Sequence, residues 1–260
     1  MESVLKRDRV VVLGGLVAIT AVAWGYLAYE AREMYQTGVC HCAGMQMSGP
    51  DTRPWSAGQL LPLFLMWAEM MVAMMIPSAA PMILTFAFVN RQRRERERPY
   101  VPTAFFLAGY LFIWTIFSAM AAFAQWALHS TSLLSSKMVS TSPVLGGVLL
   151  IAAGVFQWTP LKNTCLRHCR SPLDFLMTGW REGAVGALWM GLSHGAYCAG
   201  CCWFLMALLF VAGVMNVLWI AVIALLVLVE KALPAGPILG RWTGVLLTTW
   251  GVWVLFKGVV

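Results

Sequence analysis

Cysteine, histidine and methionine gather at three places in this 260-residue sequence, and these are the residues whose types and spacing could do chemistry. Thiolate and thioether sulfurs are soft donors that select Cu(I) over hard cations, and imidazole suits several transition metals. The three groups therefore predict the binding of a soft metal. We expect copper, held as Cu(I), with zinc as the alternative ion.

The densest group is His194-Gly-Ala-Tyr-Cys198-Ala-Gly-Cys201-Cys202. His194, Cys198 and either Cys201 or Cys202 are separated by four and then three or four residues, so they share one face of a helix. Met190 extends this face by one turn. The segment lies in an apolar stretch, and an ionisable side chain inside a membrane is costly and marks a functional site. We predict that this histidine and the three cysteines are metal ligands, although a single cysteine in such a helix is usually a small apolar filler.

A second group, Cys165-Leu-Arg-His168-Cys169, follows a predicted membrane span. If the segment is helical, Cys165 shares a face with His168 and Cys169. The neighbouring Arg167 favours thiolates. We predict metal ligands at Cys165, His168 and Cys169. The alternative is an interfacial basic loop with idle thiols.

The third group is Cys40-His41-Cys42, followed by Met45 and Met47, in a loop with several glycines. Cys40 and Cys42 are too close in sequence for a comfortable structural disulfide. We predict that Cys40, His41, Cys42, Met45 and Met47 capture a soft metal. An exposed loop with a chance grouping of these residues is the alternative.

A methionine-rich stretch, Met66–Met82, supplies a further set of candidate ligands. Met66, Met70 and Met74 lie four residues apart on one helical face, and Glu69 borders that face. Methionine also fills cores without any other function, but the adjacent carboxylate favours a metal-binding role for all four residues. Depth from the two membrane surfaces, at about 1.5 Å per helical residue, places Glu69 and His194 near the same level and suggests that they meet. Pro77 should kink this helix, and the carbonyl it frees needs another partner.

These residues must be positioned by membrane helices, because 60% of the chain is hydrophobic and only 11% is charged. About 20 apolar residues cross a bilayer as a helix. We expect an all-α, polytopic helix bundle in which residues 1–260 form a single integral membrane domain. About seven spans are predicted, and they are Val10–Tyr29, Leu60–Asn90, Thr103–His129, Pro143–Trp158, Ala184–Val211, Met215–Lys231 and Leu239–Lys257.

Lysine and arginine are distributed unevenly between the loops that join these spans. With the N-terminus inside, 14 of the 18 basic residues fall in inside segments, as the positive-inside rule requires. This predicts the N-terminus in and the C-terminus out. The basic run at Arg91–Arg98 is expected at lipid headgroups, and no nucleic-acid partner is expected, because a short loop without aromatic residues or a surrounding fold does not bind nucleic acid. Glu230 and Lys231 end the sixth span, where interfacial pairing and lysine snorkelling explain them.

The sequence resembles a bacterial family of predicted metal-binding integral membrane proteins of unknown function. The resemblance rests on Met66–Met82, Gly154–Arg170, Gly191–Trp203, Gly213–Asn216 and Glu230–Lys231, and covers most of the chain from about residue 60. It implies metal binding in a multi-pass protein of the bacterial inner (cytoplasmic) membrane. Glu69 and the Cys40–Cys42 loop are not matched to the family pattern.

Three functions are compatible with these residues. The first is copper transfer, delivery or homeostasis, with the lipid bilayer, the metal ion and a soluble metal-binding protein or metalloenzyme as partners. The second is a thiol-disulfide or quinone oxidoreductase using Cys198-x-x-Cys201. The third is a membrane assembly factor for a metalloprotein. Catalysis is the less favoured class, and the chain shows no nucleotide-binding motif.

Overall fold

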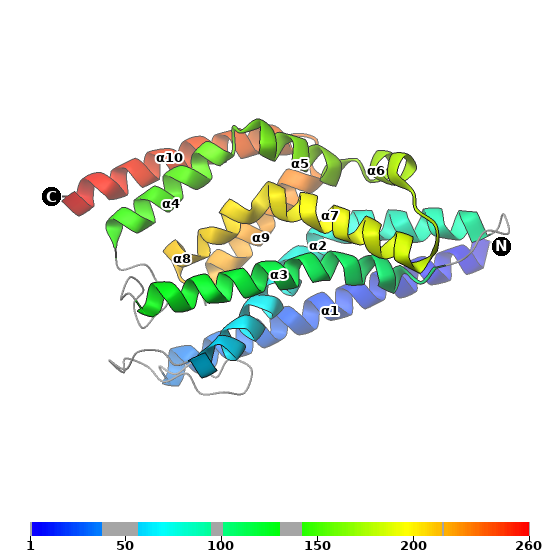
Figure 1. Cartoon of the computed structure of the whole chain (residues 1–260), viewed down its shortest axis with the longest axis horizontal. Helices are drawn as coiled ribbons and strands as arrows, with labels where there is room; N and C mark the ends of the chain where they lie inside the picture. Colours follow the sequence, from blue (N-terminus) through cyan, green and yellow to red (C-terminus); the bar gives the residue numbers. More distant parts are fainter. Residues whose placement is uncertain (1, 38–56, 95–100, 131–141, 215, 260) are drawn as a thin grey trace.

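A computed structural model describes residues 2–37, 57–94, 101–130, 142–214 and 216–259. Regular secondary structure within these ranges is helical, with no strand. Most of the helices run along one long axis (Figure 1). The predicted all-α fold is confirmed, as expected for a chain whose backbone polar groups must be satisfied without water.

Five helical segments are long and apolar enough to cross a membrane. They lie in α1 (Glu2–Thr37), α2 (Leu60–Arg94), α3 (Thr103–Ser130), α7 (Gly183–Ala207) with α8 (Leu209–Ala212), and α10 (Gly236–Val259). A sixth is counted if α4 (Pro143–Phe156) and α5 (Pro160–Arg170), which are bent by 63°, form one broken span. At 16 residues, α9 (Val217–Ala232) is shorter than these segments. Seven spans and their orientation stay predictions.

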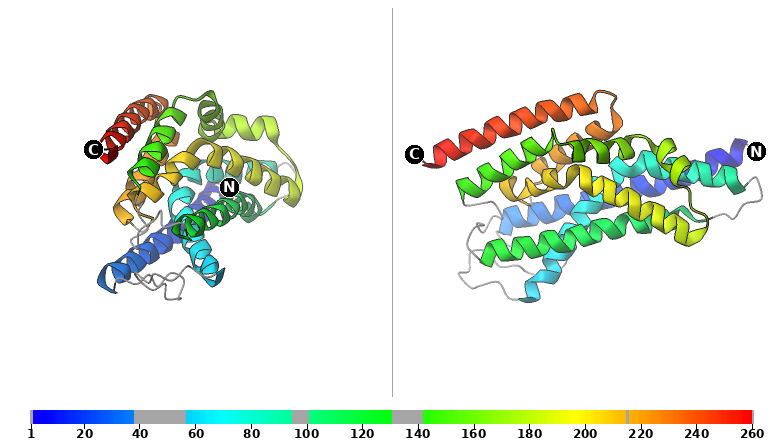
Figure 2. Two further views of the ribbon diagram at one scale, coloured as in Figure 1. Left: turned by 60° about the vertical axis from the view of Figure 1, so that its left-hand side comes forward. Right: turned by 45° about the horizontal axis from the view of Figure 1, so that its top comes forward.

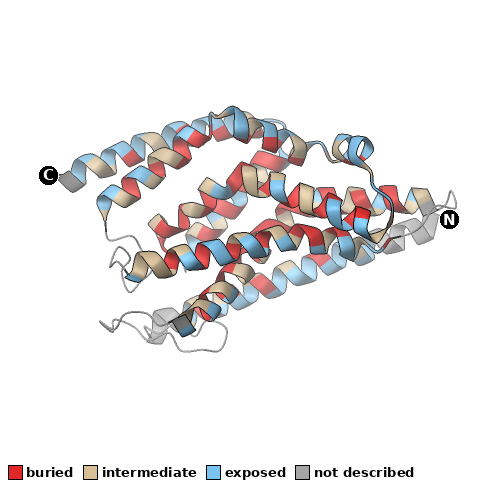
Figure 3. Ribbon diagram, in the orientation of Figure 1, coloured by how far each residue is buried: buried red, intermediate tan, exposed pale blue. Residues whose placement is uncertain are grey.

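The helices form two groups with the candidate site between them. Helices α4 and α10 run side by side along one edge, and α1, α2 and α3 lie on the opposite side (Figures 1 and 2). Helices α7 and α9 lie between the two groups. Short helices η2 (Ala57–Gln59) and α6 (Pro172–Gly179) precede α2 and α7, respectively. Buried residues concentrate on α2 and α7, whereas α1 and α10 expose much of their surface (Figure 3).

Glycines let α3 and α7 approach closely. A Cβ atom on Gly191 would lie 2.0 Å from the Phe106 carbonyl oxygen, and one on Gly109 would lie 2.2 Å from the Leu188 carbonyl oxygen. Small residues at helix interfaces permit this approach in membranes. This close contact holds the His194 face of α7 against α3.

The interior prolines of α2 leave the helix continuous but change its hydrogen bonding. Pro77 has no N–H to donate to the Ala73 carbonyl four residues earlier. The Trp24 indole of α1 donates to that carbonyl instead, at 3.0 Å. A freed carbonyl therefore finds a partner in a neighbouring helix, as the sequence predicted for Pro77.

Candidate metal centre

One face of α7 carries the densest predicted ligand group, and that face is buried. Met190, His194, Cys198, Cys201 and Cys202 are each at most 3% exposed. The Cys201 and Cys202 thiols both donate to the Cys198 carbonyl at 3.0 Å. The helical spacing thus places the three sulfurs within one turn, inside the bundle.

Helix α5 brings a second pair of cysteines to this face. Its first turn is capped by Thr159, whose hydroxyl accepts from the Lys162 N–H, and Pro160 stands at the start of the helix. The Cys169 thiol lies beside the Cys198 and Cys201 thiols and interacts with both. The segment is helical, as the predicted spacing of its ligands requires. It joins two sequence groups into one cluster, which we call the thiol cluster (Cys169, Cys198, Cys201 and Cys202).

Cys165 lies beside the thiol cluster on the same face of α5. A Cβ atom on Gly200 would be 2.9 Å from the Cys165 sulfur, so the missing side chain at Gly200 makes room for this thiol. All five described cysteines are free and buried. They provide soft donors from two helices in a site shielded from water.

Lys231 of α9 reaches the thiol cluster, and sequence reasoning missed this. Its ammonium donates to the Cys198 sulfur at 2.9 Å and to the Ser78 hydroxyl at 3.1 Å. Lys231 is 8% exposed and Glu230 is 2% exposed. The interpretation of this pair as interfacial and snorkelling was therefore wrong, because α9 inserts both residues among α2, α5 and α7 rather than ending at a headgroup.

Glu230 is engaged by a different lysine. The Lys162 ammonium lies 2.6 Å from the Glu230 carboxylate, and both side chains are at most 3% exposed. The Gln157 side chain also accepts from Lys162, and Arg170 donates to the Glu230 backbone carbonyl at 3.0 Å. In the described part of the chain, Lys231 makes no ion pair with a carboxylate. Its ammonium is instead directed at the sulfur of Cys198.

Tyr110 of α3 completes the surroundings of Cys198. Its hydroxyl lies 3.2 Å from the Cys198 sulfur and donates to the Met75 carbonyl at 3.1 Å. Helix α2 therefore reaches the cluster indirectly, because Met75 contacts Tyr110 and Ser78 contacts Lys231. The sequence offered a weak signal for these contacts, because Ser78 and Lys231 both fall in the segments that carry the family resemblance.

His194 lies one turn before Cys198, in an aromatic pocket. Its ring stacks on Tyr110 with centroids 5.5 Å apart and on Phe106 at 6.1 Å, and it meets Phe175 edge-on at 5.8 Å. The Nδ1 atom is buried and has no hydrogen-bond partner among the described residues. A buried unpaired ring nitrogen is rare and calls for an explanation, and it fits an imidazole that is available to a metal.

The structure gives Glu69 and His194 different neighbours. Glu69 is partly buried on α2 and lies near Glu30 of α1. It precedes Met75 by six residues, or about 9 Å along the helix. Met75, and not Glu69, supplies the α2 carbonyl that contacts Tyr110, the ring stacked on His194. The suggested meeting of Glu69 and His194 is therefore not seen among the described contacts, and it stays a prediction.

Met66, Met70 and Met74 are buried, each at most 1% exposed, on α2. Their burial is what core packing also requires, so a ligand role for these methionines remains a prediction. Met75 is the α2 methionine whose backbone carbonyl accepts from Tyr110, the residue beside Cys198, among the described contacts.

His168 turns away from the sulfur atoms of its own group. Its ring stacks on Tyr197 at 4.1 Å and 3°, and its Nδ1 atom contacts the Thr164 carbonyl at 2.9 Å. The third predicted group, Cys40, His41, Cys42, Met45 and Met47, lies outside the described residues. Its capture role stays a prediction.

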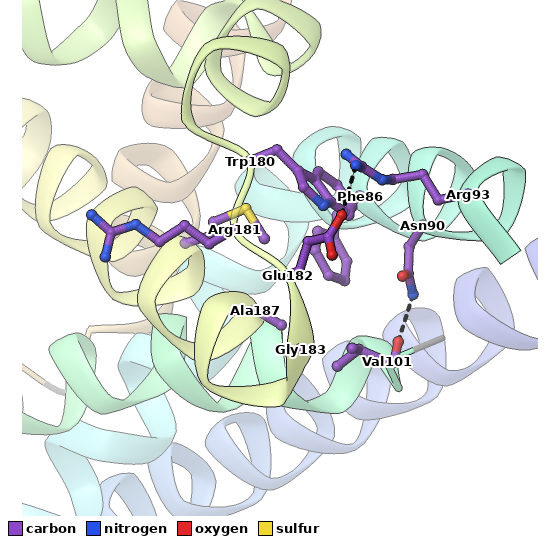
Figure 4. Close-up of a pocket in the computed structure, with 10 residues that line it drawn as sticks. Phe86, Asn90, Arg93, Val101, Trp180, Arg181, Glu182, Gly183 and Ala187 are labelled. Atoms are coloured by element: carbon purple, nitrogen blue, oxygen red, sulfur yellow. Dashed lines mark hydrogen bonds and ion pairs between the residues drawn. The ribbon is translucent and has the colours of Figure 1, made fainter. Parts of the chain in front are cut away.

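A small hollow lies near the end of α2, about two turns of α7 away from Cys198. Arg93 pairs with Glu182 at 3.1 Å and lies over the Trp180 ring at 4.7 Å, and Asn90 donates to the Val101 carbonyl at 2.5 Å (Figure 4). Met190 also lines this hollow. The first residue of the α7 ligand face is therefore also a wall of the hollow.

No preformed metal site is found in the described ranges, where no group of three or more His, Cys, Asp or Glu side chains is arranged to hold an ion. Lys231 instead occupies a position beside Cys198. The donor set nevertheless fits a soft ion, because it consists of thiols with an adjacent unpaired imidazole. Binding would require the thiols to rearrange around the ion.

The fold and the cluster define a class: an all-α protein with five helices long and apolar enough to span a membrane, and with buried thiols beside an imidazole and an ammonium. A family model described as PpoB2, copper chaperone, matches residues 64–254. The chain belongs to this copper chaperone family. No curated protein and no solved structure matches the chain. The family supports copper, and its matched range contains every described cysteine.

Proposed function

We propose that this chain is a membrane copper chaperone that holds Cu(I) in the thiol cluster and passes it to a partner. The metal is the cargo of the protein. Cys169, Cys198 and Cys201 are the primary ligands in this proposal, and His194 and Cys202 are neighbouring donors. The observation that carries it is the meeting of Cys169 with Cys198 and Cys201 in one buried cluster, in a chain of the copper chaperone family.

Transfer requires access to the cluster from the surface. Met190 lines the hollow beside Arg93 and Glu182, and His194 and Cys198 follow it at four-residue intervals on α7. Thioether, imidazole and thiolate are all Cu(I) donors. This face of α7 therefore supports a route for the ion between the hollow and the thiol cluster.

The other predicted ligands are assigned to capture and release. Cys40, His41, Cys42, Met45 and Met47 form an outer capture loop in the proposal, and Met66, Glu69, Met70 and Met74 line its approach along α2. Cys165 sits next to the cluster on α5, and His168 lies on the same helix, stacked on Tyr197. We assign both residues to exchange with a soluble metal-binding protein or metalloenzyme. We place the protein in the bacterial inner membrane.

The proposal is tested by elemental analysis of detergent-purified protein reconstituted with Cu(I) under anaerobic conditions. Wild-type protein should retain copper, and Cys169→Ala, Cys198→Ala and Cys201→Ala should each lower the bound fraction at least tenfold at limiting copper. Ser118→Ala is the matched control, because Ser118 is a buried residue of α3 that donates to the Trp114 carbonyl. Equal copper content in all variants would refute the thiol cluster as the site.

A second variant distinguishes a metal-ligand role of His194 from a role in packing. His194→Phe keeps an aromatic ring among Phe106, Tyr110 and Phe175 but removes both nitrogens. Weaker Cu(I) binding with unchanged thermal stability would assign the imidazole to the metal. Quinone-dependent thiol oxidation by metal-free wild-type protein, together with no retained copper, would instead support the oxidoreductase alternative.

A further inference from the structure

Among the residues that the structure describes, the Lys231 ammonium beside the thiol cluster pairs with no carboxylate. Lys231 is 2.9 Å from the Cys198 sulfur. The adjacent Glu230 is held by Lys162 at 2.6 Å, with Gln157 accepting from the same ammonium. Two buried lysines thus face one buried carboxylate, and the second lysine is directed at the sulfurs.

Ser78 fixes the direction of the Lys231 side chain. Its hydroxyl accepts from the ammonium at 3.1 Å, and it donates to the Met75 carbonyl at 3.0 Å. The ammonium is therefore anchored to α2 on one side and to Cys198 of α7 on the other. A metal bound to Cys198 would lie within a few ångströms of this charge.

We propose that Lys231 is a specificity-determining residue that makes the thiol cluster prefer a monovalent soft ion over a divalent one. The inference rests on the proposed function, since it assigns charge selectivity to the same site. For any given set of thiolates, the ammonium repels a divalent ion twice as strongly as a monovalent ion. Little water is present to screen this repulsion, because the cluster is buried.

Charge balance shows the preference for a site with two thiolates. Two thiolates and a monovalent ion carry a charge of −1, which Lys231 neutralises. The same thiolates with a divalent ion are neutral, so the ammonium is left as an uncompensated buried charge, and buried unpaired charges are strongly unfavourable. Lys231 therefore stabilises the complex with the monovalent ion and destabilises the complex with the divalent ion.

The test compares Ag(I) with Cd(II), two soft closed-shell ions that differ in charge. Affinities are measured by chelator competition on full-length protein in detergent. Lys231→Met should lower the ratio of Ag(I) affinity to Cd(II) affinity at least about tenfold, given a charge a few ångströms away at an effective dielectric constant near 20. Lys231→Arg keeps the charge and should leave the ratio within about threefold of wild type.

A substitution at Ser78 keeps Lys231 and compensates its charge, so the test does not depend on the Lys231 variants alone. Ser78→Asp adds a carboxylate beside the ammonium and should shift the ratio in the same direction, whereas Ser78→Ala should not. An unchanged ratio in both Lys231→Met and Ser78→Asp, with Ag(I) still bound at the cysteines, would overturn the inference and leave the proposed function standing. Failure of wild-type protein to bind Ag(I) or Cu(I) at these cysteines would refute the proposed function itself.

Discussion

The ion pair between Lys162 and Glu230 is predicted to be a main support of the site. Lys162→Met removes the ammonium but keeps most of the side-chain volume. At 2.6 Å and an effective dielectric constant of 20, the Coulomb attraction is about 6 kcal/mol before desolvation. Removing one partner of a buried pair typically costs about 3–5 kcal/mol, because the other charge is left uncompensated.

The structure also indicates how the Glu230 carboxylate would respond to the loss of Lys162. With Lys162 gone, Lys231 is the adjacent ammonium on α9, so Glu230 should draw it away from Cys198. Lys162→Met is therefore expected to lower thermal stability and also to alter metal binding. A double variant, Lys162→Met with Glu230→Leu, removes both charges and should recover most of the lost stability.

The assay is reversible unfolding in mixed micelles, followed by circular dichroism, for the wild type, both single variants and the double variant. The coupling energy of this cycle should exceed about 2 kcal/mol. Losses that simply add, with the double variant the least stable of the four, would refute the argument. That result would mean that the two side chains contribute by packing and not by pairing.

Two further predictions concern helix contacts. Gly191→Ala should destabilise the protein by more than about 2 kcal/mol through overpacking, because its Cβ atom would lie 2.0 Å from the Phe106 carbonyl oxygen. The control is Gly179→Ala, whose Cβ atom meets nothing within 4 Å. Equal melting temperatures of the two variants would contradict the close approach of α3 and α7. Trp24→Phe should cost about 1–2 kcal/mol by leaving the Ala73 carbonyl unpaired, and this loss should shrink in a Pro77→Ala background that restores the helical N–H. A loss that is the same in both backgrounds would show that the indole contributes by packing alone.

Much of the site could be predicted from the spacing of residues along single helices. Cys198, Cys201 and Cys202 share a face with His194 because a helix repeats every 3.6 residues, and the helical form of α5 follows the same rule. The soft character of these donors indicated copper, and the copper chaperone family agrees with that expectation. The all-α fold was predicted from the low content of charged residues and the length of the apolar stretches.

Contacts between helices required the tertiary structure. The approach of Lys231 to Cys198 joins residues 33 positions apart, and the pairing of Lys162 with Glu230 joins residues 68 positions apart. Hydropathy alone makes a charged pair at the end of an apolar run look interfacial. Only the packing of α9 against α2 and α7 shows that both residues are buried.

The sequence by itself determined which side chains lie on one face of each helix, because that depends on local backbone geometry. It also determined which donors are soft, because that depends on residue type. Only the tertiary structure decided which faces meet. Membrane depth, counted in helical residues from each surface, suggested Glu69 as the neighbour of His194. The packed helices place Tyr110, Phe106 and Phe175 around His194. The rotation and the approach of each helix are set by the close packing of many side chains from other helices, and no single segment contains that information.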